Sequence, residues 1–170
     1  MKKLLIVLLI FAVLASVCGC VEEEPEIQVP VNFYYRRTQV TFEDSNGVIA
    51  PEVREAQGHE NDLSYLLDLY LSGPNGEDME RTFPYGTKLV SISVSEERTT
   101  VTVTSHFANL NNVDLTIACA CITKTVMELT NTGSVEIKAH GTMLNGADSV
   151  IMDNENVLLL DDSAMDPATN

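Results

Sequence analysis

The strongest hydrophobic pattern in the chain has the period of an α-helix and lies between residues 63 and 71. Its apolar side chains recur at spacings of three and four residues, so they form one stripe: Leu63, Leu66, Leu67, Tyr70 and Leu71. Asn61 or Asp62 can cap the start of this helix. Gly73 supplies a left-handed residue beyond the last turn, and Pro74 prevents continuation. We therefore predict an amphipathic helix that stops at the Gly-Pro pair.

A second helical pattern follows Asn111 and Asn112, either of which can cap it. Its apolar stripe is formed by Leu115, Ala118, Cys119, Ile122, Val126 and Leu129. At about 100° per residue, Cys119 falls within the stripe and Cys121 about 200° from it. We therefore interpret Cys119 as a small core residue, and we expect the two thiols neither to bind one ion nor to bond to each other. Residues 131–133, Asn-Thr-Gly, end this helix.

Alternation of apolar and polar residues predicts strands at 31–35 and 135–139, and a hairpin between 89 and 104. One face of the hairpin is apolar, with Val90, Ile92, Val94, Val101 and Val103. The opposite face carries hydroxyl groups: Ser91, Ser93, Thr100, Thr102 and Thr104. This pattern is typical of a sheet that is covered on one side only. The hydroxyl face is either a hydrated surface or a docking face for another subunit or for cell-wall polymer.

Two further segments have weaker patterns. Asn46-Gly47 is a turn signal within residues 39–58, which favours a small hairpin or an irregular extension. Pro51 places this part at a sheet edge. Residues 156–162 have the composition of a late strand, which we expect to pair with residues around 150–152.

The order of these elements predicts an α+β fold. We expect a two-layer sandwich, in which a mixed β-sheet of about four main strands carries two helices on one face, with small extra hairpins.

The glycine-rich loop between the first helix and the hairpin is not typical of a phosphate site. A phosphate loop precedes a helix, whose amide groups then point at the anion, whereas this loop follows one. Glu77, Asp78 and Glu80 would also repel phosphate. We interpret the loop as a helix stop and a connector.

The N-terminus indicates export and attachment to a membrane. Lys2 and Lys3 precede an apolar run from Leu4 to Ala15, which is typical of a secretory signal. Two cysteines follow, and Cys20, preceded by a glycine, fits a lipidation site better than Cys18, preceded by a valine. An ordinary cleaved secretory signal is the alternative. We expect a lipid-anchored protein on the extracytoplasmic face of the cell membrane.

The charge of the chain excludes one class of partner. The formal net charge is −15, and loss of Lys2 and Lys3 with residues 1–19 would make it −17. Nucleic acid and anionic lipid head groups would both be repelled. We therefore expect no nucleic-acid binding, and we attribute most of the acidity to solubility.

Metal and catalytic chemistry find little support in the sequence. His59, His106 and His140 are scattered singly, so a zinc site with the Cys-Ala-Cys pair lacks ligands. The acidic groups lack the alternating spacing of a calcium loop: residues 22–24, 77–80 and 161–162. Ser105, His106 and Asp114 could be imagined as a hydrolase triad, but adjacent residues on a strand point to opposite faces. We expect no catalytic residue, no metal and no cofactor, with His106 solvated and Phe107 packed under the second helix.

Several of these segments together resemble the GerMN domain, a sporulation and spore-germination module. They are the strand Val-Asn-Phe-Tyr-Tyr, the helix end with Gly73-Pro74, the Pro-Tyr-Gly-Thr segment at 84–87, Ser105-His106-Phe107 and residues 133–141. His140-Gly141 departs from the family's Asp-Gly, as do residues 39–58 and the tail from 142. The resemblance implies a non-enzymatic envelope domain, similar to ring-building modules, with no catalytic residue to carry over.

The resulting domain organisation has five parts. We expect a lipoprotein signal peptide at 1–19, a lipidated cysteine and acidic tether at 20–30, a GerMN-like domain at 31–141, a C-terminal extension packed on it at 142–160 and a disordered tail at 161–170. The function that we expect is a membrane-anchored, non-catalytic scaffold of the cell envelope, linked to sporulation or germination. Its partners would be envelope proteins or a second copy, bound through the hydroxyl face. The alternative is a lipid-anchored accessory that binds a solute or the cell wall, although one compact domain offers little room for a cleft.

Overall fold

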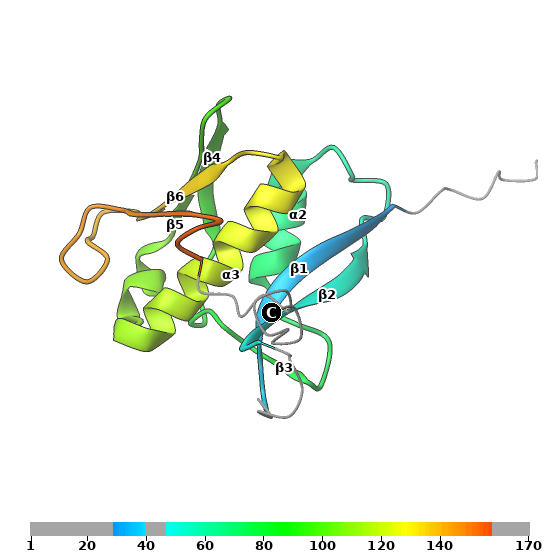
Figure 1. The fold of residues 1–170 in the computed structure, drawn as a ribbon, viewed down its shortest axis with the longest axis horizontal. Helices are drawn as coiled ribbons and strands as arrows, with labels where there is room; N and C mark the ends of the chain where they lie inside the picture. Colours follow the sequence, from blue (N-terminus) through cyan, green and yellow to red (C-terminus); the bar gives the residue numbers. More distant parts are fainter. Residues whose placement is uncertain (1–28, 40–46, 158–170) are drawn as a thin grey trace, which may run out of the picture.

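The computed structural model describes residues 29–39 and 47–157 of the chain. The signal peptide, Cys20, Asn46 and residues 158–170 lie outside these ranges, so the predictions about them stay predictions. The fold is α+β, as the sequence pattern predicts, and its elements form two sheets and two α-helices (Figure 1).

The main sheet has four strands in the order β4-β5-β6-β7: Leu89–Val94, Thr99–Val103, Ser134–Ala139 and Val150–Asp153. Strand β5 pairs antiparallel with β4 and parallel with β6, and β7 is antiparallel to β6. The sheet is therefore mixed. Its parallel step is made through helix α3, Asn112–Thr130, because parallel neighbours need a crossover connection.

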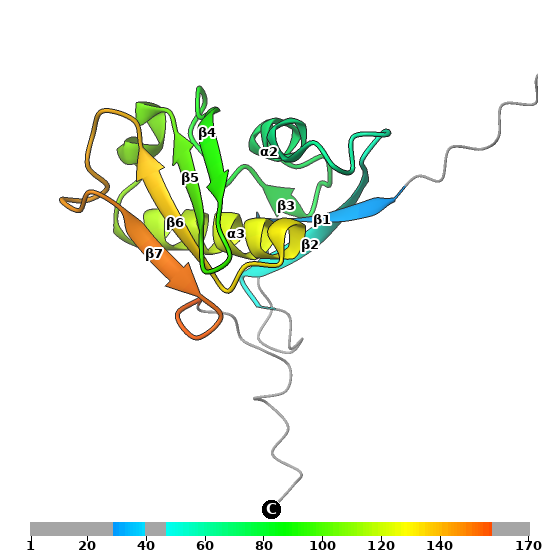
Figure 2. The same ribbon diagram turned by 90° about the horizontal axis from the view of Figure 1, so that it is seen from above.

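A second, smaller sheet holds the N-terminal strand, so the strand predicted at 31–35 is not one of the four strands of the main sheet. The order of the smaller sheet is β2-β1-β3, with β1 at Pro30–Arg37, β2 at Ile49–Glu55 and β3 at Met79–Glu80. Pro51 lies in β2, at an edge of this sheet, as predicted. Figure 2 shows α3 between the main sheet and β1, and β1 begins on the side of the molecule away from the main sheet.

Both helices begin and end near the predicted residues. Helix α2 runs over Leu63–Leu71, and the Asp62 carboxylate accepts a hydrogen bond from the Tyr65 N–H at 3.0 Å. Gly73 follows with φ 105°, a conformation that favours glycine. Helix α3 ends at Asn131, which adopts the left-handed conformation with φ 54°.

A series of contacting aromatic rings forms much of the core between the two sheets. Tyr70 of α2 lies with its ring centroid 5.1 Å from that of Tyr35 in β1 and 5.1 Å from that of Phe83. The ring centroid of Phe83 in turn lies 6.3 Å from that of Phe107, which is fully buried. These rings therefore join the smaller sheet, α2 and the main sheet into one core.

The predicted orientation of Cys121 is wrong. Cys119 and Cys121 are both fully buried, as are Ala120, Thr123 and Thr125 between and beyond them. Burial extends around α3 because the main sheet covers one side of the helix and β1 covers another (Figure 2). A helical wheel with a single apolar stripe does not anticipate a helix packed on two sides.

The predicted apolar face of the first hairpin strand is also partly wrong. Val90 and Val94 are about half exposed, whereas Leu89 and Ile92 pack against the core. The register shifts between Leu89 and Ser91, which indicates a β-bulge that changes the alternation of side chains.

Of the late strand predicted at 156–162, only Asn156 and Val157 lie within the described residues. Strand β7 pairs with β6, and Asn156 and Val157 belong to the turn that follows it. The Asp153 carboxylate accepts hydrogen bonds from the N–H groups of Glu155 and Asn156, both at 2.9 Å, which favours this turn over a continued strand.

Candidate functional site

The hydroxyl residues of the hairpin share the outer face of the main sheet, away from the helices. Ser91 lies opposite Thr102, and Ser93 lies opposite Thr100. Residues directly opposite each other on paired strands point to the same face. This face lies on the side of the sheet away from α3 (Figure 2); Ser91 and Ser93 are exposed, and Thr100 and Thr102 are half-buried.

Strand β6 adds an ion pair to this face. Glu136 lies beside Thr100 and Lys138 beside Thr102. The Lys138 Nζ lies 3.1 Å from a carboxylate oxygen of Glu136, and the Thr100 hydroxyl donates to the other oxygen at 3.2 Å. We call these six residues the outer face: Ser91, Ser93, Thr100, Thr102, Glu136 and Lys138.

Electrostatics hold Glu136 in its charged form. Partial burial alone would raise its pKa, but hydrogen bonds from Lys138, Ser149 and Thr100 outweigh burial and hold the pKa below its ordinary value. The outer face therefore presents a fixed, charged pair surrounded by neutral hydroxyl groups.

Thr104 has a different role from the other hydroxyl residues. Its hydroxyl donates to the Gly86 carbonyl at 2.8 Å and accepts from the Lys88 N–H at 3.2 Å. Both hydrogen bonds tie the end of β5 to the segment that leads into β4. The Thr104 hydroxyl is therefore used in hydrogen bonds within the domain.

The structure does not assemble a triad from Ser105, His106 and Asp114. Ser105–Asn109 form a short 3-10 helix, so the premise that Ser105 and His106 lie on a strand is wrong. Asp114 accepts a hydrogen bond from Arg36 at 3.0 Å. The His106 ring packs on Gly86, where an added Cβ would lie 2.9 Å from the ring. Within the described residues, no hydrogen bond links the three side chains.

The backbone amides of the glycine-rich loop do hold an anionic group, which is the side-chain carboxylate of Glu52 in β2. The N–H groups of Asn75 and Gly76 donate to the Glu52 carboxylate at 3.0 and 2.9 Å. Burial of Glu52 opposes its charge, but these amides and Arg54 outweigh burial and lower its pKa. The Arg54 guanidinium pairs with Glu52 and donates to the Gly73 carbonyl at 2.6 Å. The loop is a connector whose amides are already occupied.

The two cysteines behave as core residues. Burial raises the pKa of each thiol to about 12, so both are protonated at neutral pH. Neither forms a disulfide. In residues 29–39 and 47–157, no cluster of three or more His, Cys, Asp or Glu side chains could hold a metal ion.

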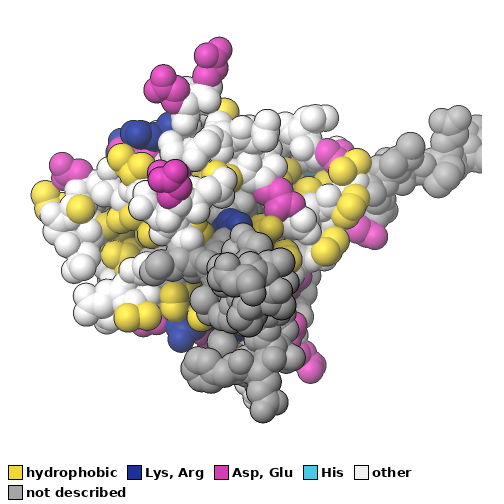
Figure 3. Space-filling model, in the orientation of Figure 1, with side chains coloured by type: hydrophobic (Ala, Val, Ile, Leu, Met, Phe, Trp, Pro, Cys, Tyr) yellow, Lys and Arg dark blue, Asp and Glu magenta, His cyan; other side chains and the backbone are white. Residues whose placement is uncertain are grey.

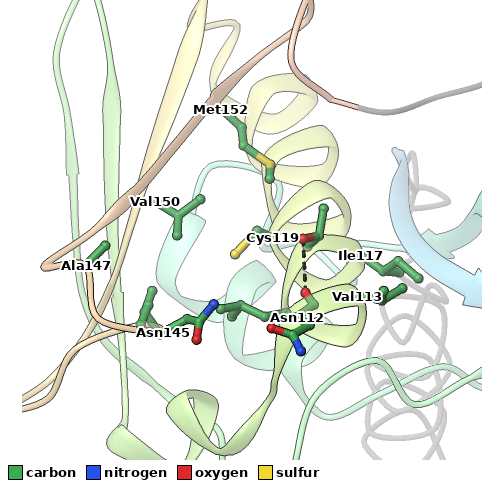
Figure 4. Close-up of a pocket in the computed structure, with 11 residues that line it drawn as sticks. Asn112, Val113, Ile117, Cys119, Asn145, Ala147, Val150 and Met152 are labelled. Carbon is green, nitrogen blue, oxygen red and sulfur yellow. Dashed lines mark hydrogen bonds between the residues drawn. The ribbon is translucent and has the colours of Figure 1, made fainter.

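An apolar groove of about 650 Å³ lies between α3 and β7. Val150 and Met152 of β7 form one side and residues of the first half of α3 form the other; Figure 4 shows Cys119 nearest to β7 and Val113 and Ile117 farther round the helix. The remaining lining residues are Asn112, Leu115, Thr116, Cys119, Leu144, Asn145 and Ala147. Sequence patterns missed this groove because it is built from two segments that only the fold brings together.

Acidic side chains are dispersed over the face shown in Figure 3 rather than gathered into a cluster. This distribution is typical of a hydrated surface. Of the two α-helices in the described ranges, neither has the length and apolar character that crossing a bilayer requires.

Comparison with known proteins identifies relatives of this fold. A family model described as "Germane: Sporulation and spore germination" matches residues 32–145, which is more than half of the chain. The tandem GerMN domains of the sporulation protein GerM from Bacillus subtilis match with a TM-score of 0.52 at 17% identity, over 78% of this chain and 47% of that chain.

Two further solved structures are similar at lower scores. The first GerMN domain of Bacillus subtilis GerM has a TM-score of 0.49 at 15% identity, over 74% of this chain and 95% of its own. A Clostridium perfringens protein inferred to be a lipoprotein has a TM-score of 0.48 at 18% identity, over 76% and 89%. The curated proteins contain no match to this chain.

Proposed function

The chain belongs to the Germane family of sporulation and spore germination, and from this premise we propose that it is a lipid-anchored assembly module of the cell envelope. Cys20 carries the lipid, and the residues between it and β1, 21–29, form a short acidic tether. At about 3.3–3.6 Å per residue, such a tether keeps the domain within a few tens of ångströms of the membrane.

The observation that supports this proposal best is the outer face of the main sheet. A sheet normally buries one face and hydrates the other. Here the outer face carries short neutral hydroxyl side chains from β4 and β5 and an ion pair, Glu136–Lys138, from β6. Short side chains lose little conformational entropy when they are covered, so another surface can cover this face at a small entropic cost.

The same proposal assigns no chemistry to the domain. The groups that sequence patterns offered as nucleophiles or metal ligands are engaged elsewhere: Asp114 binds Arg36, and the two thiols are buried and protonated. The proposed role is therefore contact between envelope components.

A substitution experiment tests this role. Thr102→Lys places a second cation beside Lys138, and we expect it to reduce crosslinking of the native protein to its neighbours in cells. Thr142→Lys is the matched control, because Thr142 is exposed on the loop between β6 and β7. Circular dichroism on both variants checks that the fold is intact.

Unchanged crosslinks with Thr102→Lys would reject the outer face as the contact surface. Loss of the cellular phenotype with Ser105→Ala, at normal crosslinking, would favour an enzyme instead.

A further inference from the structure

Strand β7 leaves one edge of the main sheet open beside the groove. It is the last strand in the order β4-β5-β6-β7, and in residues 29–39 and 47–157 no strand pairs with its other edge. The unpaired N–H and C=O groups of an edge strand can pair with a further strand. β7 therefore offers main-chain hydrogen bonds to a segment that lies alongside it.

The groove lies where the side chains of such a segment would point. A strand added to β7 would lie about 4.8 Å beyond it, with every second side chain directed toward α3. Val150 and Met152 already point from β7 toward α3 (Figure 4). Val113 on α3 is 67% exposed at this groove, although it is apolar. Apolar side chains from an added strand would cover it.

Two asparagines at one end of the groove suit the main chain of a peptide. Asn112 and Asn145 both have positive φ, 37° and 50°, and Figure 4 shows their side chains at the same end. The hydroxyl of Thr116 is occupied, since it donates to the Asn112 carbonyl at 3.0 Å. A carboxamide both donates and accepts, so these two side chains match the amide groups of a peptide better than a charged head group.

The charges around the groove select the kind of peptide. No lysine or arginine lines it; Asp148 lies just before β7, Asp153 is its last residue and Glu155 lies just after it. An anionic ligand such as a fatty acid would be repelled, whereas basic residues at the ends of a peptide would be attracted.

We propose that the groove and the open edge of β7 bind an extended peptide segment of a partner protein, apolar at alternate positions and basic at its ends. The segment adds a fifth strand to the main sheet and buries its apolar side chains against α3. This is recognition by strand addition, in which main-chain hydrogen bonds give affinity and alternate side chains give specificity. The site is separate from the outer face, so either can exist without the other.

The test uses the full-length chain and a fluorescent probe peptide, acetyl-Lys-Val-Thr-Val-Thr-Val-Lys-amide, with binding measured by anisotropy. We expect saturable binding that Val113→Asp weakens at least about ten-fold, because a carboxylate would be buried among apolar side chains. Val53→Asp is the matched control, because Val53 is 65% exposed on β2 and is absent from the groove. It should bind the probe normally.

A second pair of measurements separates strand addition from simple apolar contact. Methylation of alternate amide nitrogens on the peptide edge that faces β7 should abolish binding. Asn145→Gly, which suits the positive φ, should weaken binding while circular dichroism stays unchanged. Binding that survives both changes would overturn the proposal.

Two controls test whether the groove binds an acyl chain or a segment of the same chain instead. If decanoate displaces the probe at equal concentration, the groove takes acyl chains and the proposal fails. If the probe binds only after Leu158, Leu159 and Leu160 are all replaced by serine, the groove serves the chain's own segment and the proposal fails as well. Absence of probe binding in every variant also rejects it.

Discussion

The hydroxyl of Tyr70 donates a hydrogen bond to the main-chain carbonyl of Tyr34 at 3.0 Å. The Tyr34 N–H donates to the Thr125 hydroxyl at 2.9 Å, so side chains of both α-helices satisfy the backbone of one residue of β1. In return, the Tyr35 hydroxyl donates to the Tyr70 carbonyl at 2.6 Å. These contacts fix β1 against α2 and α3, while β2 pairs with β1 at Tyr34 and Tyr35.

Removal of the side-chain hydroxyl should cost more stability at Tyr70 than at Tyr35. Tyr70→Phe leaves the Tyr34 carbonyl without this donor, and we expect the free energy of unfolding to fall by about 1–3 kcal/mol. Tyr35→Phe should cost about 1 kcal/mol, because the Tyr70 carbonyl keeps the Gly73 N–H as a donor at 3.1 Å. Urea denaturation of both variants measures the difference; equal losses would contradict the assigned roles.

The Glu52–Arg54 pair should be among the most sensitive ionic contacts. Glu52→Gln leaves the buried guanidinium without its counter-charge, and we expect a loss of about 3 kcal/mol in unfolding free energy. Glu80→Gln is the control, because its pair with Arg36 is largely exposed and should cost no more than about 1 kcal/mol. Urea midpoints of the two variants should therefore separate clearly.

Low pH should destabilise the protein in part by protonating the Glu52 carboxylate. The pKa of Glu52 is lowered in the folded protein, so its contribution is present above its ordinary value of 4.5 and is lost as the pH falls below it. The pKa of Glu136 is also lowered in the folded protein, so its contribution to stability is likewise lost at low pH. Unfolding free energy should thus fall below about pH 4.5, and the fall should be shallower in Glu52→Gln. A parallel pH profile in wild type and variant would reject this origin.

The thiols of Cys119 and Cys121 should react with a disulfide reagent only when the protein unfolds, because both are buried and their pKa values are raised to about 12. Labelling rates should therefore rise with urea along the unfolding curve. Cys119→Ala and Cys121→Ala should each cost on the order of 1 kcal/mol, with neither clearly the more sensitive. Fast labelling of Cys121 in the native protein would place it at the surface.

Lipidation at Cys20 is tested on the mature N-terminus. Mass spectrometry should find diacylglyceryl-Cys20, and Cys20→Ala should release the protein from membranes. Cys18→Ala should leave both the modification and the membrane fraction unchanged. A free N-terminus at another residue would indicate an ordinary secretory signal instead.

The sequence predicted those elements whose signals are local. The stripe of α2, its Asp62 cap and its Gly73 stop depend on residues within one or two turns, so the pattern is sufficient. Cys121 was misplaced because its burial depends on β1, which precedes it by more than 80 residues. A β-bulge at Leu89–Ser91 likewise changes the alternation that the strand pattern assumes.

The candidate sites likewise include residues that a local pattern predicts and residues that only the tertiary fold brings together. The pairing of Ser91 with Thr102 and of Ser93 with Thr100 follows from a short hairpin, so the outer face could be expected from the sequence. Glu136 and Lys138 join it only through the parallel pairing of β5 with β6. The groove requires α3 and β7 to be brought together, and no local pattern encodes that contact.

The position of β1 at the far side of the domain also bears on access. Strand β1 starts on the side of the molecule opposite the main sheet (Figure 2), and the residues that lead to Cys20 precede it directly. An anchor at Cys20 would therefore be attached to the domain beside the smaller sheet, and the outer face and β7 lie away from that point of attachment. Attachment at that point would leave both surfaces open to other components of the envelope.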